Sequence, residues 1–253
     1  MTARFTGKTV LVTGGGTGIG QAIALAFARE GAKVVVAGRR EGPLKETVAH
    51  VEAEGGEAVA ITADVTRAED VRNLVERTVA RFGGLDVAVN NVGMLTTPAK
   101  VADMDEEDWD LLMGTNLKGI WLSMKYEIGH MREHGGGAIV NISSNLGAHM
   151  RLSRLGAYAT SKAAVSALTR NAALDHIGDG VRINAVSPGP VETPMSTRPG
   201  ESSLDKADRM SREVPVGRAG TPDEIAAAVL HLASDEAGYT VGADLVLDGG
   251  ITA

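Results

Sequence analysis

Several residue types and patterns are missing or rare in this sequence. Its 253 residues include no cysteine, which excludes disulfide bonds, zinc thiolate sites and cysteine nucleophiles. Aromatic residues make up only 3% of the chain, so Val, Ala, Leu and Ile must form much of the core. No apolar run reaches the roughly 18 residues of a membrane-spanning helix, and the opening MTARFTGKTV has no apolar signal core. We therefore expect no membrane partner and a cytoplasmic location.

A surplus of basic residues is also missing. The 25 Lys and Arg residues face 32 Asp and Glu residues, which gives a net charge of −7. Because nucleic acids attract positively charged surfaces, we expect no nucleic-acid partner. Hydrophobic residues at 43% and charged residues at 23% are sufficient for a substantial core. The length fits one large α/β domain, and we expect residues 1–253 to form it.

Short apolar segments alternate with longer amphipathic ones along the chain. Strands that are apolar almost throughout must be covered on both faces, which predicts a parallel sheet between helix layers. The predicted fold class is α/β, a doubly wound Rossmann fold with a seven-stranded, mainly parallel sheet. Strands are expected at 8–14, 33–38, 57–64, 85–91, 137–143, 181–188 and 243–249. Helices are expected at 18–31, 42–55, 67–83, 105–135, 157–178 and 222–234.

The least patterned stretch covers residues 193–220. Such a stretch is long for a connection inside a compact domain, so we expect either disorder or a substrate lid over about 193–217. Its methionines suit contact with an apolar substrate or simple packing, and its arginines suit an anionic substrate or a solvated surface. The residues concerned are Met195, Met210, Arg198 and Arg209.

A glycine-rich segment, 13-TGGGTGIG-20, follows the first predicted strand and opens the first predicted helix. Gly14 permits a tight turn, Gly18 lets the backbone approach a pyrophosphate, and Gly20 allows close packing of helix on sheet. The helix N-terminus presents free N–H groups to phosphate. No GKS or GKT follows, which disfavours a nucleotide-triphosphate loop. We predict a dinucleotide site that includes Gly14, Gly16, Thr17, Gly18, Ile19 and Gly20.

Two arginines follow the second predicted strand, where an NAD site usually has an acid that binds the ribose 2′-hydroxyl. Gly38 stands at the end of that strand, followed by Arg39 and Arg40. A guanidinium pairs with a 2′-phosphate through two hydrogen bonds. We therefore predict NADP(H) as the preferred cofactor. NAD(H) remains an alternative, because two arginines also suit a solvated loop.

Tyr158 and Lys162 are four residues apart, and such residues are neighbours on a helix. Tyrosine has an ordinary pKa near 10. A nearby ammonium group favours the phenolate and brings the hydroxyl toward the range of a general acid/base. Upstream, 141-NISSNLG-147 places hydroxyl groups at the end of a predicted strand. A structural YxxxK pair is common, so this pair alone does not establish chemistry.

The motifs TGxxxGxG, 90-NNVG-93, ISS and YxxxK occur in this order, with Asn116 between the second and third and 187-SPGPVETP-194 after the last. This ordered set resembles the short-chain dehydrogenase/reductase family in its single-domain form of about 250 residues, and the resemblance extends from Gly7 to the final DGG. It implies hydride transfer between a nicotinamide cofactor and a secondary alcohol/ketone pair. The implied catalytic residues are Asn116, Ser144, Tyr158 and Lys162.

The resemblance also implies a role for each of these residues. Tyr158 would exchange a proton with the substrate oxygen, and Ser144 would orient that oxygen. Lys162 would lower the tyrosine pKa and hold the nicotinamide ribose, and Asn116 would hold a water that links Lys162 to solvent. The implied contacts on the adenosine side are Asp64, Val65, Asn90, Val92 and Gly93. Those at the nicotinamide carboxamide are Pro188, Gly189, Val191 and Thr193.

Three details depart from the family pattern. Thr17 stands where many NADP-binding relatives have a basic residue, and the usual NNAG reads NNVG. Ser144 and Tyr158 are fourteen positions apart, one more than usual, and the expected position holds Asn145, which has no hydroxyl. The SxxG pattern favours Ser144 as the catalytic serine, with one extra residue in 148–156. Ser143 is the alternative.

Other functions and features stay open at this point. A 3-oxoacyl-thioester reductase is the alternative within the family, and an NADP(H)-sensing protein without turnover is the alternative from another class. The resemblance implies a homotetramer, with helices 105–135 and 157–178 at one interface and residues 239–253 at another. His130 and His134 have the spacing of a metal-binding pair, but they fit a helix end better, and we expect no metal site.

Overall fold

The computed structural model describes residues 3–198 and 200–253. Its centre is a seven-stranded sheet with the order β3-β2-β1-β4-β5-β6-β7, in which every neighbouring pair is parallel. The predicted Rossmann fold with seven strands is confirmed. The strands are β1 Thr9–Thr13, β2 Lys33–Gly38, β3 Glu57–Thr62, β4 Val87–Asn90, β5 Gly137–Ile142, β6 Val181–Pro188 and β7 Asp244–Leu247.

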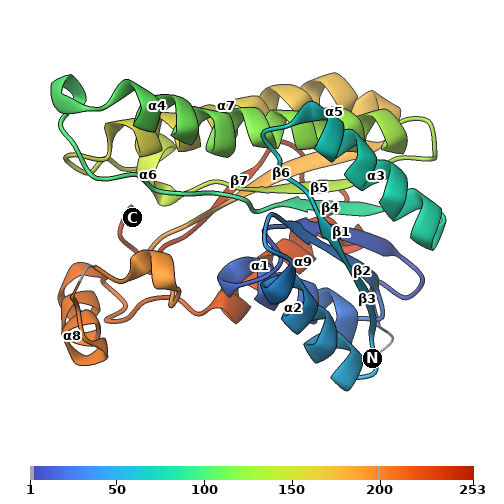
Figure 1. Ribbon diagram of the computed structural model, residues 1–253, viewed down its shortest axis with the longest axis horizontal. Coiled ribbons are helices and arrows are strands. Elements are labelled where there is room, and N and C mark those ends of the chain that lie inside the picture. The colour runs from blue at the N-terminus through green and yellow to red at the C-terminus, as the bar shows by residue number, and fades with distance from the viewer. Residues whose placement is uncertain (1–2, 199) are drawn as a thin grey trace.

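Helices cover both faces of the sheet (Figure 1). On one face lie α1 Gly18–Arg29, α2 Glu41–Ala53 and α9 Pro222–Ala233. On the other lie α3 Ala68–Phe82, α4 Glu106–Met113, α5 Gly119–Met131 and α7 Gly156–His176. In the described residues, no helix is long and apolar enough to cross a membrane.

Strand β1 shows why the sheet needs two helix layers. All five of its residues are buried. Val10 and Val12 pack in a cluster with Phe27 of α1, whereas Leu11 packs in a second cluster with Val165 of α7. Successive side chains of a strand point to opposite faces. An apolar strand of this kind is therefore stable only between two apolar layers.

The strand order reverses at β1, which is the functionally important point of the topology. The chain runs from β1 to β2 and β3 on one side, and then returns to place β4 on the other side of β1. Thr13 at the end of β1 is in register with Ala37 of β2 and Asn90 of β4. The loops that leave these strand ends diverge and open a crevice, where ligands bind in open α/β sheets.

Two predicted segments differ from the structure. The helix expected over 105–135 is divided into α4 and α5 by a π-helical turn, Gly114–Lys118. The lid region contains α8, Ser203–Glu213, whose first turn is held by reciprocal hydrogen bonds between Ser202 and Asp205. The disordered alternative is therefore wrong for the described part of this region. Pro199, inside the predicted lid, lies outside the described residues.

Short helical turns complete the chain. They are α6 Asn145–Ala148 and the 3-10 turns Val101–Asp103, Ile177–Asp179, Pro194–Ser196 and Asp235–Ala237. The turn α6 directly follows β5, and Pro194–Ser196 follows β6. Both therefore lie at the carboxyl ends of the strands, as does the glycine loop after β1.

Candidate active site

The glycine loop connects β1 to α1 in the conformation that its residues predict. Gly14 and Gly18 have φ values of 67° and 56°, a region that favours glycine. A Cβ atom on Gly20 would lie 2.2 Å from the carbonyl oxygen of Gly14, so no other residue fits there. Thr17 precedes α1 in extended conformation and its side chain makes no capping hydrogen bond. The first N–H groups of α1 are thus available to a ligand.

A pocket of about 660 Å³ opens beside this loop. Its volume is in the range of small-molecule and cofactor sites. The predicted residues that line it are Gly14, Gly16, Thr17, Gly18, Ile19, Arg39, Arg40, Asp64, Val65, Val92, Gly93 and Thr193. Lining residues that the sequence did not indicate include Pro43, Leu44, Asn91, Thr115 and Met195. Residues from β1, β2, β4 and β6 loops therefore converge at one site.

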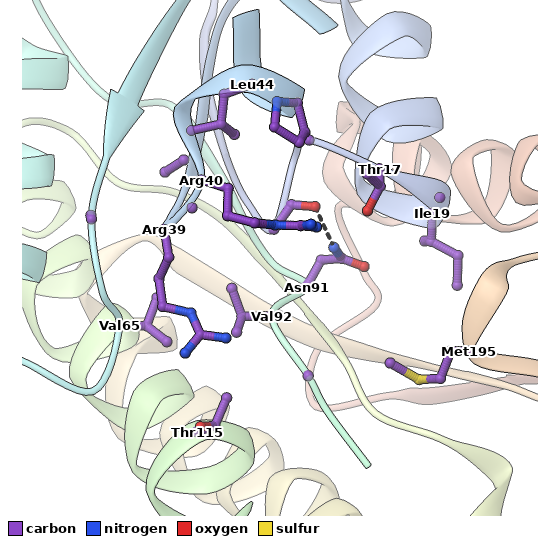
Figure 2. Close-up of a pocket in the computed structure, with 18 of the residues that line it drawn as sticks. Thr17, Ile19, Arg39, Arg40, Leu44, Val65, Asn91, Val92, Thr115 and Met195 are labelled. Atoms are coloured by element: carbon purple, nitrogen blue, oxygen red, sulfur yellow. Dashed lines mark hydrogen bonds between the residues drawn. The ribbon is translucent and has the colours of Figure 1, made fainter. Parts of the chain in front are cut away.

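Arg39 and Arg40 both extend into the pocket, with Arg39 beside Val65 and Val92 (Figure 2). Glu41, the next residue, pairs with Lys45 instead, at 2.9 Å. In the part of the chain that the structure describes, neither guanidinium forms an ion pair with a carboxylate. Two positive charges therefore face the pocket, which suits an anionic group of a ligand.

Asp64 also lines the pocket, as an ionised carboxylate. Burial acts to raise its pKa, but hydrogen bonds from the Thr66 N–H (2.9 Å) and hydroxyl (2.8 Å), together with the charge of Arg39, hold the pKa below its ordinary value. Asp64 therefore offsets part of the charge of Arg39, and the two arginines together still leave this part of the pocket with a net positive charge.

The end of β4 requires a correction. The Asn90 side chain lies in the core, where its Nδ2 donates to Glu127 Oε2 at 2.9 Å and Asn141 Oδ1 at 3.1 Å, so it does not line the pocket. The next residue, Asn91, does so, and its Nδ2 donates to the carbonyls of Thr13 and Gly14 at 3.3 and 3.2 Å. Figure 2 shows Asn91 with one of these hydrogen bonds. Asn91 therefore joins the β4 loop to the glycine loop.

Tyr158 stands near the start of α7, with the Ser144 side chain beside its hydroxyl. Burial raises the pKa of the Tyr158 hydroxyl above its ordinary value, and the nearby Ser144 side chain opposes this effect. The expected lowering by Lys162 is not seen in the protein chain alone. The Lys162 Nζ lies 5.9 Å from the centroid of the tyrosine ring, so burial dominates.

Lys162 is 3% exposed, and its Nζ donates to the carbonyl of Ile142 at 2.8 Å. Burial lowers the pKa of its ammonium group to about 8. A Cβ atom on Gly93 would lie 3.3 Å from this Nζ and 3.8 Å from Asn116 Oδ1. The NNVG motif therefore ends in glycine where the pocket wall passes directly over the lysine.

Asn116 lies in the π-helical turn, a feature that often marks functional sites. Its Oδ1 accepts from the N–H of Met94 at 2.8 Å, and its Nδ2 donates to the Met94 carbonyl at 2.9 Å. The amide thus fixes the backbone just after Gly93. Its role in holding a water stays a prediction.

The two serines after β5 have different environments. The Ser143 hydroxyl donates to the carbonyl of Lys162 at 2.9 Å and lies 3.0 Å from Ser166 Oγ, so it is a core group. Ser144 contacts Tyr158. The structure therefore favours Ser144 over Ser143 as the serine of the site, despite the longer spacing.

The segment after β6 reaches the pocket next to the glycine loop, where Thr193 lies beside Gly18. Thr193 lines the pocket, and a Cβ atom on Gly18 would lie 3.3 Å from its Cγ2. Pro188 and Gly189 end β6 against the C-terminal segment, where a Cβ on Gly189 would lie 2.7 Å from Asp248 Cβ. Val191 is 4% exposed. Only Thr193 of these four predicted contacts is among the pocket lining.

The candidate substrate contacts of the lid separate into two groups. Met210 is buried in a cluster with Val214, Ala219 and Ile251, whereas Met195 is 50% exposed at the pocket. Arg209 is neither solvated nor available to a substrate, because it pairs with Glu201 at 2.6 Å.

The rings of His130 and His134 stack 4.0 Å apart, and no cluster of three or more potential metal ligands occurs among the described residues.

Comparison with known proteins gives a consistent result. A family model described as Enoyl-(Acyl carrier protein) reductase matches residues 14–252. The chain is 41% identical to an uncharacterized oxidoreductase of Thermotoga maritima, over 98% of this chain and 99% of that protein. It is 38% identical to a 3-oxoacyl-(acyl-carrier-protein) reductase of the same organism (98% and 99%), and 36% identical to a cyclohexanol dehydrogenase of an Acinetobacter species (100% and 98%).

Solved structures agree. Levodione reductase superposes with a TM-score of 0.93 at 33% identity, with 98% of this chain and 99% of that chain covered. Fold and site define the class, an oxidoreductase acting on CH–OH donors with a nicotinamide cofactor. The chain belongs to the short-chain dehydrogenase/reductase family.

Proposed function

We propose that the protein is an NADP(H)-dependent oxidoreductase that interconverts a secondary alcohol and a ketone. The observation that carries this proposal is the contact between Tyr158 and Ser144, with Lys162 one helical turn away, beside a pocket of cofactor size. A cyclohexanol dehydrogenase and a cis-4-hydroxycyclohexanecarboxylate dehydrogenase among the relatives support an alcohol as substrate.

The residues of the pocket fit a nicotinamide dinucleotide. The glycine loop and the start of α1 would hold the pyrophosphate, and Arg39 with Arg40 would hold a 2′-phosphate. Thr193 would face the nicotinamide end, next to Gly18. When bound, the cofactor supplies or accepts the hydride, and the chain provides the proton chemistry.

Proton transfer at the substrate oxygen belongs to Tyr158. Its hydroxyl donates a proton to the oxygen in ketone reduction and accepts one in alcohol oxidation. The Ser144 hydroxyl, which lies beside Tyr158, orients the substrate oxygen toward the Tyr158 hydroxyl. The buried ammonium of Lys162, with a pKa of about 8, is mostly charged at pH 7 and stabilises the phenolate formed when Tyr158 gives up its proton.

Replacement of Tyr158 by phenylalanine tests the catalytic role. The Tyr158→Phe variant should bind NADPH as the wild type does and lose about 10²- to 10⁴-fold in turnover, the contribution of a general acid/base. Binding would be followed by cofactor fluorescence and turnover by absorbance of NADPH. Unchanged turnover would contradict the assignment. Tight NADPH binding by the wild type, with no turnover of any carbonyl or alcohol, would instead favour an NADP(H) sensor.

Cofactor preference is tested by titration with NADPH and NADH. We expect NADPH to bind at least tenfold more tightly, a difference of about 1.4 kcal/mol. The double variant Arg39→Ala/Arg40→Ala should lose this preference and keep its NADH affinity. Arg72→Ala is the matched control, because Arg72 lies on α3 beside Glu76 and outside the pocket. A wild-type preference for NADH would show that the arginines serve only a solvated loop.

A second candidate is a 3-oxoacyl-thioester reductase, which the 38% identity to such an enzyme favours. Acetoacetyl-coenzyme A and cyclohexanone separate the two, since the thioester reductase should show a kcat/KM for the thioester at least tenfold higher. The physiological direction follows from the preferred substrate and cofactor pair.

A homotetramer is the assembly that we propose. Trp109, Trp121 and Leu174 are 40, 44 and 76% exposed on α4, α5 and α7, and Tyr239 is fully exposed before β7. Large apolar groups on these elements suit interfaces between copies of the chain. Light scattering should give about four times the 26.2 kDa chain mass. The cytoplasmic location stays a prediction.

A further inference from the structure

The loop that carries Ser144 has little regular structure of its own. Within the short turn α6, Leu146 has ψ 114° and Gly147 has φ 132°, both outside the helical region. Two backbone hydrogen bonds close the loop on itself, from Gly147 N–H to the Met150 carbonyl and from Met150 N–H to the Asn145 carbonyl, each at 2.8 Å. The position of the loop relative to Tyr158 must therefore come from contacts with other elements.

Two polar contacts join this loop to the last strand and the residue after it. The His149 Nε2 lies 3.0 Å from Asp244 Oδ2, at the start of β7. The Asn145 Nδ2 donates to Asp248 Oδ2 at 3.3 Å, directly after β7. Both partners are carboxylates that accept further hydrogen bonds, Asp244 from Ser187 of β6 and Asp248 from Gly250 and Thr252.

The Asp244 carboxylate is especially well held. Its side chain is 6% exposed, and its Oδ1 accepts a hydrogen bond from the Ser187 hydroxyl of β6 at 2.5 Å. The other oxygen is thereby directed at His149. A hydrogen bond from an N–H group to a carboxylate is among the stronger hydrogen bonds in proteins, because the negative charge of the carboxylate strengthens it. His149 itself is 25% exposed and lies at the surface of the loop.

We propose that His149 is a positioning residue, held by Asp244, that sets Ser144 against the Tyr158 hydroxyl. The pair compensates for the extra residue between Ser144 and Tyr158. The loop turns back through Arg154, which has φ 70°, and the His149–Asp244 pair adds a tether to β7 beside the Asn145–Asp248 bond and the packing of Gly147 on α7. A shift of about 1 Å in a catalytic group costs on the order of 10²-fold in rate. This inference rests on the proposed oxidoreductase function.

The experiment compares His149→Ala, His149→Gln and His176→Ala. We expect His149→Ala to lower kcat about 10- to 100-fold while the NADPH dissociation constant changes less than about twofold, because the cofactor pocket does not include the loop. Glutamine carries a side-chain N–H that can replace the bond to Asp244, so His149→Gln should recover most of the lost kcat.

His176→Ala is the matched control. His176 also pairs with an aspartate, Asp179, at 2.9 Å, but it lies at the far end of α7, roughly 27 Å from Tyr158 at 1.5 Å per residue. Its removal should leave kcat unchanged. A kcat of His149→Ala within twofold of the wild type, or a failure of His149→Gln to recover activity, would overturn the proposal.

A second readout does not depend on turnover. Hydrogen exchange of the peptide over residues 144–152 should become faster in His149→Ala, by about tenfold or more at the amides of Gly147 and Met150, and should not change in His176→Ala. If the wild type turns over no substrate, the proposed function fails but this exchange still reports on the tether. Unchanged exchange in His149→Ala would refute the positioning role by itself.

Discussion

Glu127 on α5 is a buried acid whose replacement should change how stability depends on pH. The residue is 1% exposed, and its one side-chain partner is the Asn90 amide, which donates at 2.9 Å. Burial raises the pKa of its carboxyl from 4.5 to about 7, against the opposing effect of Asn90. The folded protein therefore holds this proton over a pH range in which the unfolded chain has lost it.

The sign and magnitude follow from this difference. A pKa that is higher in the folded state stabilises the fold fully below pH 4.5, and the stabilisation disappears as pH rises through about 7. The gap between 4.5 and about 7 corresponds to roughly 3 kcal/mol in the free energy of unfolding. Glutamine has a similar shape and does not titrate, so Glu127→Gln should remove this pH dependence.

The assay is urea unfolding of wild type and Glu127→Gln at pH 5, 6, 7 and 8, at one protein concentration because assembly shifts apparent stability. Between pH 5 and 8, Glu127→Gln should gain about 2 to 3 kcal/mol relative to wild type. Glu133→Gln, at an exposed position shortly after the same helix, is the control and should show no such trend. A difference between wild type and Glu127→Gln that stays constant with pH would refute the reasoning.

Three further changes have defined outcomes. Lys162→Met should abolish turnover and raise the free energy of unfolding at pH 7, because burial lowers the lysine pKa to about 8 and the charged form is costly in the fold. The stability difference between variant and wild type should shrink as pH rises from 8 toward 10.5. Equal stability of the two proteins at pH 7 would contradict this prediction. Gly20→Ala would place a Cβ 2.2 Å from the Gly14 carbonyl oxygen, so we expect loss of NADPH binding in fluorescence titration. Gly42→Ala is the control, because a Cβ at Gly42 would meet no atom within 4 Å and NADPH binding should be kept. Arg209→Leu should weaken NADPH binding several-fold, because Arg209 donates to the Ser196 carbonyl at 3.0 Å and supports the segment that carries Thr193. An unchanged NADPH dissociation constant would show that Arg209 does not support the cofactor site.

Much of the cofactor site could be predicted because its chemistry is local in the chain. The glycine loop needs a strand before it and a helix after it, and all three are contiguous, so the motif and the φ values of Gly14 and Gly18 agree. Tyr158 and Lys162 are one helical turn apart in any helix. The arginines after β2 lie where the strand end directs them, into the pocket.

Prediction was weaker where two neighbouring residues compete for one role. Asn90 and Asn91 are adjacent, and so are Ser143 and Ser144, and in each pair one member faces the core and the other the site. Successive side chains of a strand point to opposite faces, so the choice depends on which face the folded sheet presents. The SxxG pattern favoured Ser144 although the spacing to Tyr158 is one residue longer than usual, and its place beside Tyr158 distinguishes it physically.

The sequence by itself determined the succession of strands and helices, the glycine loop and the tyrosine–lysine pair, because hydrophobic periodicity and short-range spacing act within a few residues. Only the tertiary structure decided the partners that come from distant parts of the chain. It buried Glu127 beside Asn90, 37 positions away, and joined His149 to Asp244 across 95 positions. Such pairings depend on how the helices and strands pack, and no local pattern encodes them.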